Sequence, residues 1–209
     1  EGYRINLGEG FLLSEVSDGY YVVPETMEVP FSGLDSKTVV LPRGTEVRII
    51  EGKVARIFSS DPVSLSGFKF SPGQELISIL SADGILPASL EEDRALPGLQ
   101  LLKGDKVSIN KNGSLRVLLP KSRVPVVDGL ELEPGEPIYF HESGSLKGAV
   151  LRRGTKIFGV DVPAGAHIYL EDNGALRWYW RKLSLFELIT HGPADVEFRY
   201  RGQKSTFLS

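Results

Sequence analysis

Few residues of this sequence have the chemistry of a catalytic or metal site. The three histidines are His141, His167 and His191, and a metal site would require them to converge. Gly144 and Gly174 hold the same position in two copies of an internal repeat, and His141 lies three residues before the first while His167 lies seven before the second. The two histidines therefore occupy different positions within the repeat, and no carboxylate motif accompanies them. His141-Glu142 is not followed by the second histidine of a zinc-protease helix. We therefore expect no metal and no other cofactor.

Two further patterns are typical of enzymes, but both occur in unsuitable contexts. Ser66-Gly67-Phe68-Lys69 matches the Ser-x-x-Lys pattern of penicillin-recognising enzymes, which needs a helix to place lysine beside serine. Here it spans a repeated glycine in an expected strand. Three acidic clusters fall in or beside expected turns, whereas a glycosidase needs two carboxylates that face each other across a cleft. The clusters are Glu91-Glu92-Asp93, Glu131/Glu133/Glu136 and Glu171-Asp172. We therefore expect that the protein is not an enzyme.

Aromatic residues form the most distinctive cluster. Trp178, Tyr179 and Trp180 are consecutive, and Tyr169 falls on the preceding expected strand. One interpretation makes these four residues an exposed platform that binds a glycan or a peptide. The other makes the tryptophans bulky plugs that close the end of the apolar core. Both tryptophans take positions that are apolar in other repeats, which favours the plug.

An internal repeat of about 30 residues must position all these side chains. Glycines recur at this spacing in three series that run in register. The series are Gly67, Gly98, Gly129 and Gly159; Gly44, Gly73, Gly104, Gly135 and Gly165; and Gly52, Gly84, Gly113, Gly144 and Gly174. Apolar and polar residues alternate between them, as in Ile138/Phe140 and Ile168/Leu170, which is typical of strands with one buried face.

The turns between these strands carry their own signals. Asp83-Gly84, Asn112-Gly113 and Asn173-Gly174 predict type I′ hairpin turns, with positive φ at both central residues. Pro72-Gly73 and Pro134-Gly135 predict a second kind of tight turn. Each repeat is therefore expected to hold three strands, and it must stack on its neighbours to bury its apolar face.

Composition excludes several classes of protein. The chain has 209 residues and a formal charge of −3 without a basic stripe, so we expect no nucleic-acid partner. No apolar run approaches the ~20 residues that a membrane-spanning helix needs. Cysteine is absent, which leaves no disulfide framework and no thiolate metal site.

These signals predict one all-β repeat domain over residues 1–209. Hairpin repeats of about 30 residues are expected to stack into an elongated sheet or solenoid, with a closed or partly open β-barrel as the alternative. Residues 1–43 form a degenerate N-terminal unit, 44–176 the regular repeats and 177–209 a C-terminal cap. In the cap, residues 181–189 suit a short helix or a strand, and Val196, Phe198 and Tyr200 alternate as a final strand.

The stretch from Glu136 to Leu146 resembles the MORN-like β-hairpin repeats of bacterial cell-envelope proteins, and the resemblance covers residues 44–176. Most such relatives have no assigned activity. The resemblance implies an exported protein of the bacterial periplasm or cell surface, with a lipid anchor as one alternative. The sequence begins at Glu1 without a methionine. A removed signal peptide or lipoprotein leader would explain this, and so would an N-terminal boundary chosen for expression.

Together these observations predict a non-enzymatic interaction or scaffold module of a bacterial cell envelope. Its partner would be a protein or an envelope glycan. The alternative is a carbohydrate-binding or carbohydrate-active domain that uses the aromatic patch of Tyr169, Trp178 and Trp180. The sequence gives no signal for the oligomeric state.

Overall fold

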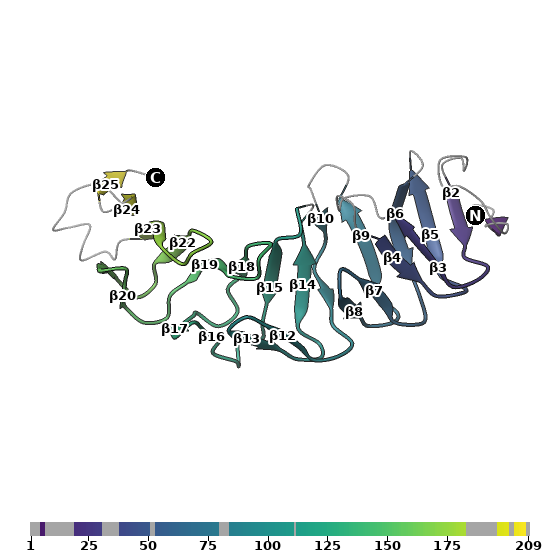
Figure 1. Ribbon diagram of the computed structural model, residues 1–209, viewed down its shortest axis with the longest axis horizontal. Helices are drawn as coiled ribbons and strands as arrows, with labels where there is room; N and C mark the ends of the chain where they lie inside the picture. The colour runs from purple at the N-terminus through teal and green to yellow at the C-terminus, as the bar shows by residue number, and fades with distance from the viewer. Residues whose placement is uncertain are drawn as a thin grey trace. The chain divides into compact units, whose positions relative to one another are not determined.

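The computed structural model describes residues 5–6, 19–30, 38–50, 53–79, 84–110, 112–182, 196–200 and 203–207. Within these ranges every regular element is a β-strand and there is no helix (Figure 1). The all-β, hairpin-rich fold expected from the glycine repeat is therefore confirmed. None of the described sheets closes into a barrel, which was the alternative.

The chain divides into two compact units inside the regular repeats. Unit 1 comprises Glu1–Ala95 and Gln100–Val117, and unit 2 comprises Leu96–Leu99 and Leu118–Ser209. No glycine-rich or proline-rich linker separates them in the sequence. The degenerate unit predicted at residues 1–43 is described only in part. Of residues 181–189, where a helix or a strand was expected, Arg181 and Lys182 end a strand and 183–189 lie outside the described residues.

In unit 1, successive pairs of short strands belong alternately to two different sheets. One sheet has the order β1-β2-β5-β6-β9-β10, a second has the order β3-β4-β7-β8, and β11, β14 and β15 are neighbours in a third. The strands are β1 (Ile5–Asn6), β2 (Gly19–Val22), β3 (Met27–Pro30), β4 (Thr38–Leu41), β5 (Glu46–Ile50), β6 (Lys53–Phe58), β7 (Val63–Leu65), β8 (Phe68–Phe70), β9 (Glu75–Ile79), β10 (Gly84–Ile85), β11 (Ala88–Ser89), β12 (Arg94–Leu96), β13 (Leu99–Leu101), β14 (Lys106–Ile109) and β15 (Leu115–Leu118), of which β12, β13 and β15 reach the border of the unit.

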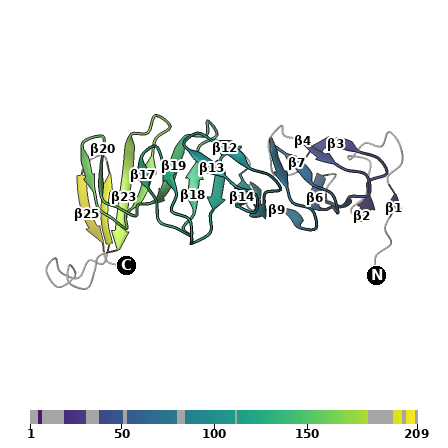
Figure 2. The same cartoon turned by 90° about the horizontal axis from the view of Figure 1, so that it is seen from below.

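Unit 2 repeats the same plan. Its main sheet has the order β18-β19-β22-β23-β24-β25, and β16-β17 and β20-β21 are separate two-stranded hairpins. Figure 2 shows β18, β19 and β23 of this sheet, in which β18 pairs with β19 and β22 lies between β19 and β23. The strands are β16 (Val126–Val127), β17 (Leu130–Glu131), β18 (Ile138–Phe140), β19 (Leu146–Val150), β20 (Thr155–Ile157), β21 (Val160–Val162), β22 (His167–Leu170), β23 (Leu176–Lys182), β24 (Val196–Tyr200) and β25 (Gln203–Phe207). The strand predicted from Val196 to Tyr200 is β24, but it is not the final one, because β25 follows it and pairs with it.

The predicted alternation of buried and exposed residues is confirmed. Ile138 and Phe140 of β18 are buried while Tyr139 between them is exposed, and Ile168 and Leu170 of β22 are buried as well. In unit 1 the same positions are held by the residue pairs Val47/Ile49 and Val107/Ile109, all of them buried. Stacked repeats therefore bury one face of each strand, which no single repeat achieves alone.

The turn prediction was wrong about where the type I′ turns lie. At Asn112-Gly113 and Asn173-Gly174 only the glycines have positive φ, at 82° and 81°. Both turns close three-residue loops, and each asparagine side chain instead accepts a hydrogen bond from the backbone two residues on, 3.2 Å from the Ser114 nitrogen and 3.0 Å from that of Ala175. A three-residue loop takes a type I turn followed by a left-handed glycine, so asparagine serves as an acceptor there.

Positive φ at two successive residues occurs in the shorter hairpins, at Ser66-Gly67, Asp128-Gly129 and Phe158-Gly159. Phe158 has φ of 46° and is 73% exposed, which is unusual for a bulky side chain. The third pair predicted as type I′ includes Asp83, which lies outside the described residues.

Candidate functional site

The aromatic residues singled out in the sequence are distributed over the two faces of the main sheet of unit 2. In the antiparallel pair β22-β23, Tyr169 lies opposite Trp178, Ile168 opposite Tyr179 and His167 opposite Trp180. Tyr179 is only 1% exposed and packs in the core, whereas Tyr169, Trp178 and Trp180 are half-buried on the outer face. The structure thus brings three of the four predicted residues together and places Tyr179 behind them.

The outer-face rings form two stacked cross-strand pairs. The ring centroids of Tyr169 and Trp178 are 5.1 Å apart with planes inclined by 13°, and those of His167 and Trp180 are 3.9 Å apart with planes inclined by 5°. The strand β22 lies between β19 and β23. Tyr169 and His167 therefore use one ring face to stack on the tryptophans of β23, and the opposite ring face is directed toward β19.

A glycine on β19 leaves room in front of these rings. Gly148 lies opposite Tyr139 of β18 on one side and opposite Tyr169 of β22 on the other. A Cβ atom at Gly148 would lie 3.0 Å from the carbonyl oxygen of Ile168, so a side chain there would push the strands apart. The two tyrosines therefore stand two strand spacings apart, about 9–10 Å between backbones, with a bare glycine between them.

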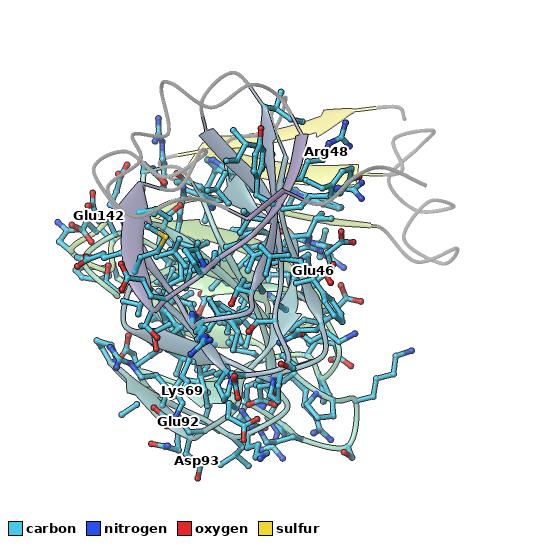
Figure 3. The ribbon with its side chains drawn as sticks, turned by 90° about the vertical axis from the view of Figure 1, so that its right-hand side faces the viewer. Glu46, Arg48, Lys69, Glu92, Asp93 and Glu142 are labelled. Carbon is cyan, nitrogen blue, oxygen red and sulfur yellow. The ribbon has the colours of Figure 1, made fainter. Side chains whose placement is uncertain are left out.

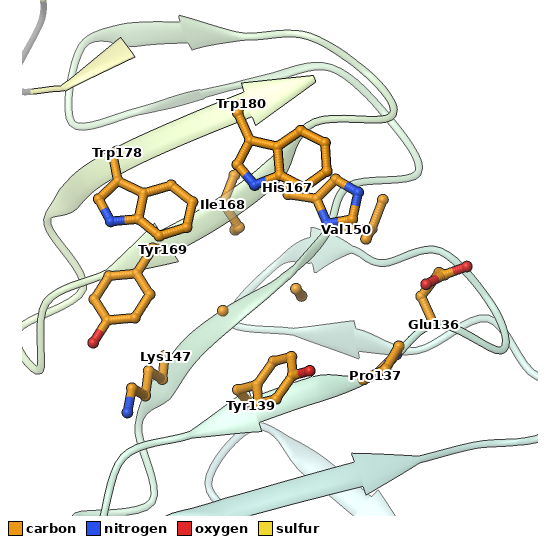
Figure 4. Close-up of a pocket in the computed structure, with 12 residues that line it drawn as sticks. Glu136, Pro137, Tyr139, Lys147, Val150, His167, Ile168, Tyr169, Trp178 and Trp180 are labelled. Atoms are coloured by element: carbon orange, nitrogen blue, oxygen red, sulfur yellow. The ribbon is translucent and has the colours of Figure 1, made fainter. Parts of the chain in front are cut away.

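This arrangement makes a concave pocket of about 380 Å³ (Figure 4). Aromatic rings dominate its rim, and Gly148, Ala149 and Val150 of β19 contribute backbone and small side chains. The residues that line it are Glu136, Pro137, Tyr139, Lys147, Gly148, Ala149, Val150, His167, Ile168, Tyr169, Trp178 and Trp180. Small-molecule sites commonly enclose about 300–1,000 Å³ and combine such apolar walls with a few polar groups.

A β-bulge brings a cation to the same face. The β18-β19 register shifts between Tyr139 and Phe140, and the extra residue on β19 is Lys147. Two successive residues of a bulged strand oppose one partner residue, and Lys147 lines the pocket beside Gly148. The Nζ atom of Lys147 lies 5.8 Å from the centroid of the Tyr169 ring, within reach of a cation–π attraction.

The β22-β23 pair has the same bulge, with Arg177 as its extra residue. The Cζ atom of Arg177 lies 5.6 Å from the Tyr169 centroid, and its Nε atom is 3.6 Å from Oε1 of Glu171. Arg177 is thus neutralised by a carboxylate, whereas Lys147 makes no ion pair with the described residues. The local charge beside Tyr169 is therefore set by Lys147.

His167 and Glu136 lie at the other end of the pocket. Burial lowers the pKa of His167 below its usual value of 6.5, and the nearby carboxylate of Glu136 partly offsets this effect. The neutral imidazole is therefore favoured near pH 7, and a neutral ring can stack on Trp180 without desolvating a charge.

We expect the lowered pKa of His167 to make the free energy of unfolding depend on pH. The unfolded chain takes up a proton on this residue near pH 6.5, while the folded chain does so only at lower pH. The free energy of unfolding should therefore fall as pH is lowered from about 7 to 5, and this slope should be smaller in His167→Gln. Urea denaturation at a series of pH values measures this slope. Equal slopes in wild type and His167→Gln would contradict a lowered pKa of His167.

The remaining sequence candidates do not form a second site. His141 directs Nε2 to the carbonyl oxygen of Leu170 at 3.0 Å, and His191 lies outside the described residues. No group of three or more potential metal ligands occurs in the described ranges. The hydroxyl of Ser66 is buried without a hydrogen-bond partner, and Lys69 instead pairs with Glu92 at 3.5 Å, so they form no Ser-Lys dyad.

Two of the acidic clusters, Glu91-Glu92-Asp93 and Glu171-Asp172, occupy solvated turns, as the sequence predicts, whereas Glu136 of the third cluster lines the pocket. Asp172 accepts hydrogen bonds from the hydroxyls of Ser143 and Ser145, which hold its pKa below the usual value. Glu91 pairs with Lys103 at 2.8 Å, and this contact likewise lowers the pKa of Glu91. Both carboxylates therefore act as turn stabilisers.

Three residues of the pocket had no signal when considered singly: Tyr139, Lys147 and Gly148. Their signal lies in the repeat itself, because Lys147 and Arg177 both come three residues after a hairpin glycine. Gly148 takes the position that Trp178 holds in the next repeat. The same repeat position therefore supplies the glycine floor of the pocket in one copy and an aromatic wall in the next.

Comparisons with known proteins give no relative for this arrangement. No protein-family model, no curated protein and no solved structure matches the chain. Among the described residues, no helix has the length and apolar character needed to span a membrane.

Proposed function

We propose that the protein is a non-enzymatic binding module that holds a carbohydrate on the aromatic face of unit 2. The observation that carries the proposal is the pocket between Tyr139 and Tyr169, walled by stacked aromatic rings and floored by Gly148. Sugar rings offer flat C–H surfaces that pack on aromatic rings and hydroxyls that need polar partners. Lys147, His167 and Glu136 supply such partners at the edges of the pocket.

The described part of the pocket has too few carboxylates for the usual mechanism of glycoside hydrolysis, which supports binding without catalysis. Glycoside hydrolysis generally uses two carboxyl groups that flank the scissile bond. Among the described residues that line the pocket, Glu136 is the only carboxylate. The proposal that the protein acts in a bacterial cell envelope rests on the resemblance of its hairpin units to MORN-like repeats.

A test of this function uses the two tryptophans as reporters, since the chain has no others. We expect an array of neutral, carboxylated and sulfated oligosaccharides to retain the protein on a subset of spots. Soluble forms of the retained sugars should then change the tryptophan emission in a saturable manner. Retention without any change in emission would place the ligand elsewhere, and an array without retained spots would count against the function.

A protein-binding role is the second candidate, and a surface of unit 1 favours it. Tyr20 and Phe58 are 47% and 46% exposed on the β2-β5-β6-β9 sheet. Together with Arg48, Arg56 and Glu75 they line a groove of about 200 Å³. Arg48, labelled in Figure 3, lies 5.5 Å from the centre of the Tyr20 ring. Exposed aromatic and arginine side chains are common in protein interfaces.

A further inference from the structure

We propose that the sugar bound by the aromatic face is acidic, and that Lys147 binds its carboxylate or sulfate group. This inference rests on the proposed function, because it names the chemical class of the ligand for the same pocket. It goes beyond the aromatic residues, which would hold neutral and charged sugars alike.

Lys147 differs from three other cations of unit 2, because it has no carboxylate partner among the described residues. In unit 2, Lys156 pairs with Asp161 at 3.5 Å, Arg153 with Glu131 at 3.0 Å and Arg177 with Glu171 at 3.6 Å. Lys147 is half-buried beside aromatic rings and has no such carboxylate among the described residues. A cation held at the edge of an apolar pocket without a counter-charge gives the site electrostatic complementarity to an anion.

The β-bulge between β18 and β19 places this cation on the pocket side of the sheet. Because Lys147 is the extra residue of the bulge, it shares the pocket with its neighbour Gly148 instead of pointing to the core. Its ammonium group lies near the Tyr169 ring, so a sugar ring packed between Tyr139 and Tyr169 would carry its substituents past Lys147. The lysine is thus beside the packed ring, where an acidic substituent can reach it.

The pocket has a positively charged end and a negatively charged end. Figure 4 shows Lys147 and Glu136 at opposite ends of the lining. Glu136 would repel an anionic group and accept hydrogen bonds from hydroxyls, so the acidic substituent is directed to the Lys147 end. His167, which stacks on Trp180 beside Glu136, favours its neutral form near pH 7 and adds no competing cation there.

The test compares wild type with Lys147→Gln and Lys147→Arg on the array of neutral, carboxylated and sulfated oligosaccharides. Lys156→Gln is the matched control, because it removes one positive charge from unit 2 outside the pocket. We expect wild type to retain acidic oligosaccharides, and we expect Lys147→Gln to bind them about tenfold more weakly. Lys147→Arg keeps the positive charge and should recover part of the binding to acidic oligosaccharides that Lys147→Gln loses. Lys156→Gln should bind as wild type does. Circular dichroism of each variant confirms that it folds.

Two further comparisons separate the sources of the effect. Methyl esterification of a retained carboxylated oligosaccharide removes its charge and should reproduce the loss seen with Lys147→Gln, while the sulfated spots show whether sulfate serves as well. Raising the salt from about 0.05 to 0.5 M should weaken binding to wild type more than to Lys147→Gln, because salt screens the ion pair.

Each other outcome overturns the inference in a distinct way. Retention of neutral sugars alone would refute the acidic ligand and leave the carbohydrate-binding function in place. Acidic sugars retained equally by Lys147→Gln would remove Lys147 from the site. Failure to retain any sugar, with unchanged tryptophan emission, would overturn both proposals.

Discussion

Trp178→Ala is expected to weaken carbohydrate binding by about 2 kcal/mol, or roughly 30-fold in Kd. Trp178 stacks on Tyr169 and holds that ring upright against the pocket, so its removal takes away contact area and frees the tyrosine at once. Isothermal titration calorimetry with an oligosaccharide retained on the array measures the change.

The control for Trp178 is Tyr20→Ala, which removes another exposed aromatic ring from the outer face of a sheet, in unit 1. It should leave the affinity unchanged. If Trp178→Ala bound the oligosaccharide as well as wild type did while Tyr20→Ala weakened it, the ligand surface would lie in unit 1 and the assignment would be wrong.

Tyr179→Ala is expected to lower the free energy of unfolding of unit 2 by about 3–5 kcal/mol, the usual cost of truncating a buried aromatic side chain. Tyr179 is among the largest fully buried side chains and lies opposite Ile168 on the core face. Urea denaturation followed by circular dichroism gives the value.

The comparison for Tyr179 is Tyr139→Ala, since Tyr139 is 41% exposed and borders the pocket. We expect this variant to change stability by less than about 1 kcal/mol, as surface substitutions usually do, while it reduces ligand binding. Equal destabilisation by both variants would contradict the division into a core face and a binding face.

The repeat lattice was sufficient to predict the strands. Ile138, Phe140, Ile168 and Leu170 were expected to be buried on alternating positions, and all four are. Glycine spacing and period-two alternation depend only on local geometry and burial, which a single sequence records directly.

The face of the tryptophans could not be predicted in the same way, because a β-bulge changes the phase of the alternation. Without the bulge, Leu176 and Trp178 would share the core face. With Arg177 inserted, Leu176 lies opposite Leu170 and Tyr179 lies opposite Ile168, so Tyr179 takes the core position. The expectation that the tryptophans plug the core followed from the apolar residues that hold their positions in other repeats. Gly148 and Val150 hold these positions in the preceding repeat, and both line the pocket too.

The turns show the same limit. Asn-Gly is compatible with a two-residue type I′ turn and with a three-residue loop, and the loop length decides between them. The hydrogen bonds from Asn110 N to Ser114 O and from Glu171 N to Ala175 O fix the three-residue loop, and a dipeptide signal does not record which residues pair.

Acrylamide quenching of tryptophan fluorescence, with and without a bound oligosaccharide, tests the central claim most directly. Both tryptophans of the chain line the pocket, so the whole signal reports on this site. We predict that the free protein is readily quenched and that a saturating acidic oligosaccharide lowers the quenching constant. Emission that acrylamide cannot reach in the free protein would show that the tryptophans are core residues. Quenching unaffected by a bound sugar would show that the aromatic face is not the binding site.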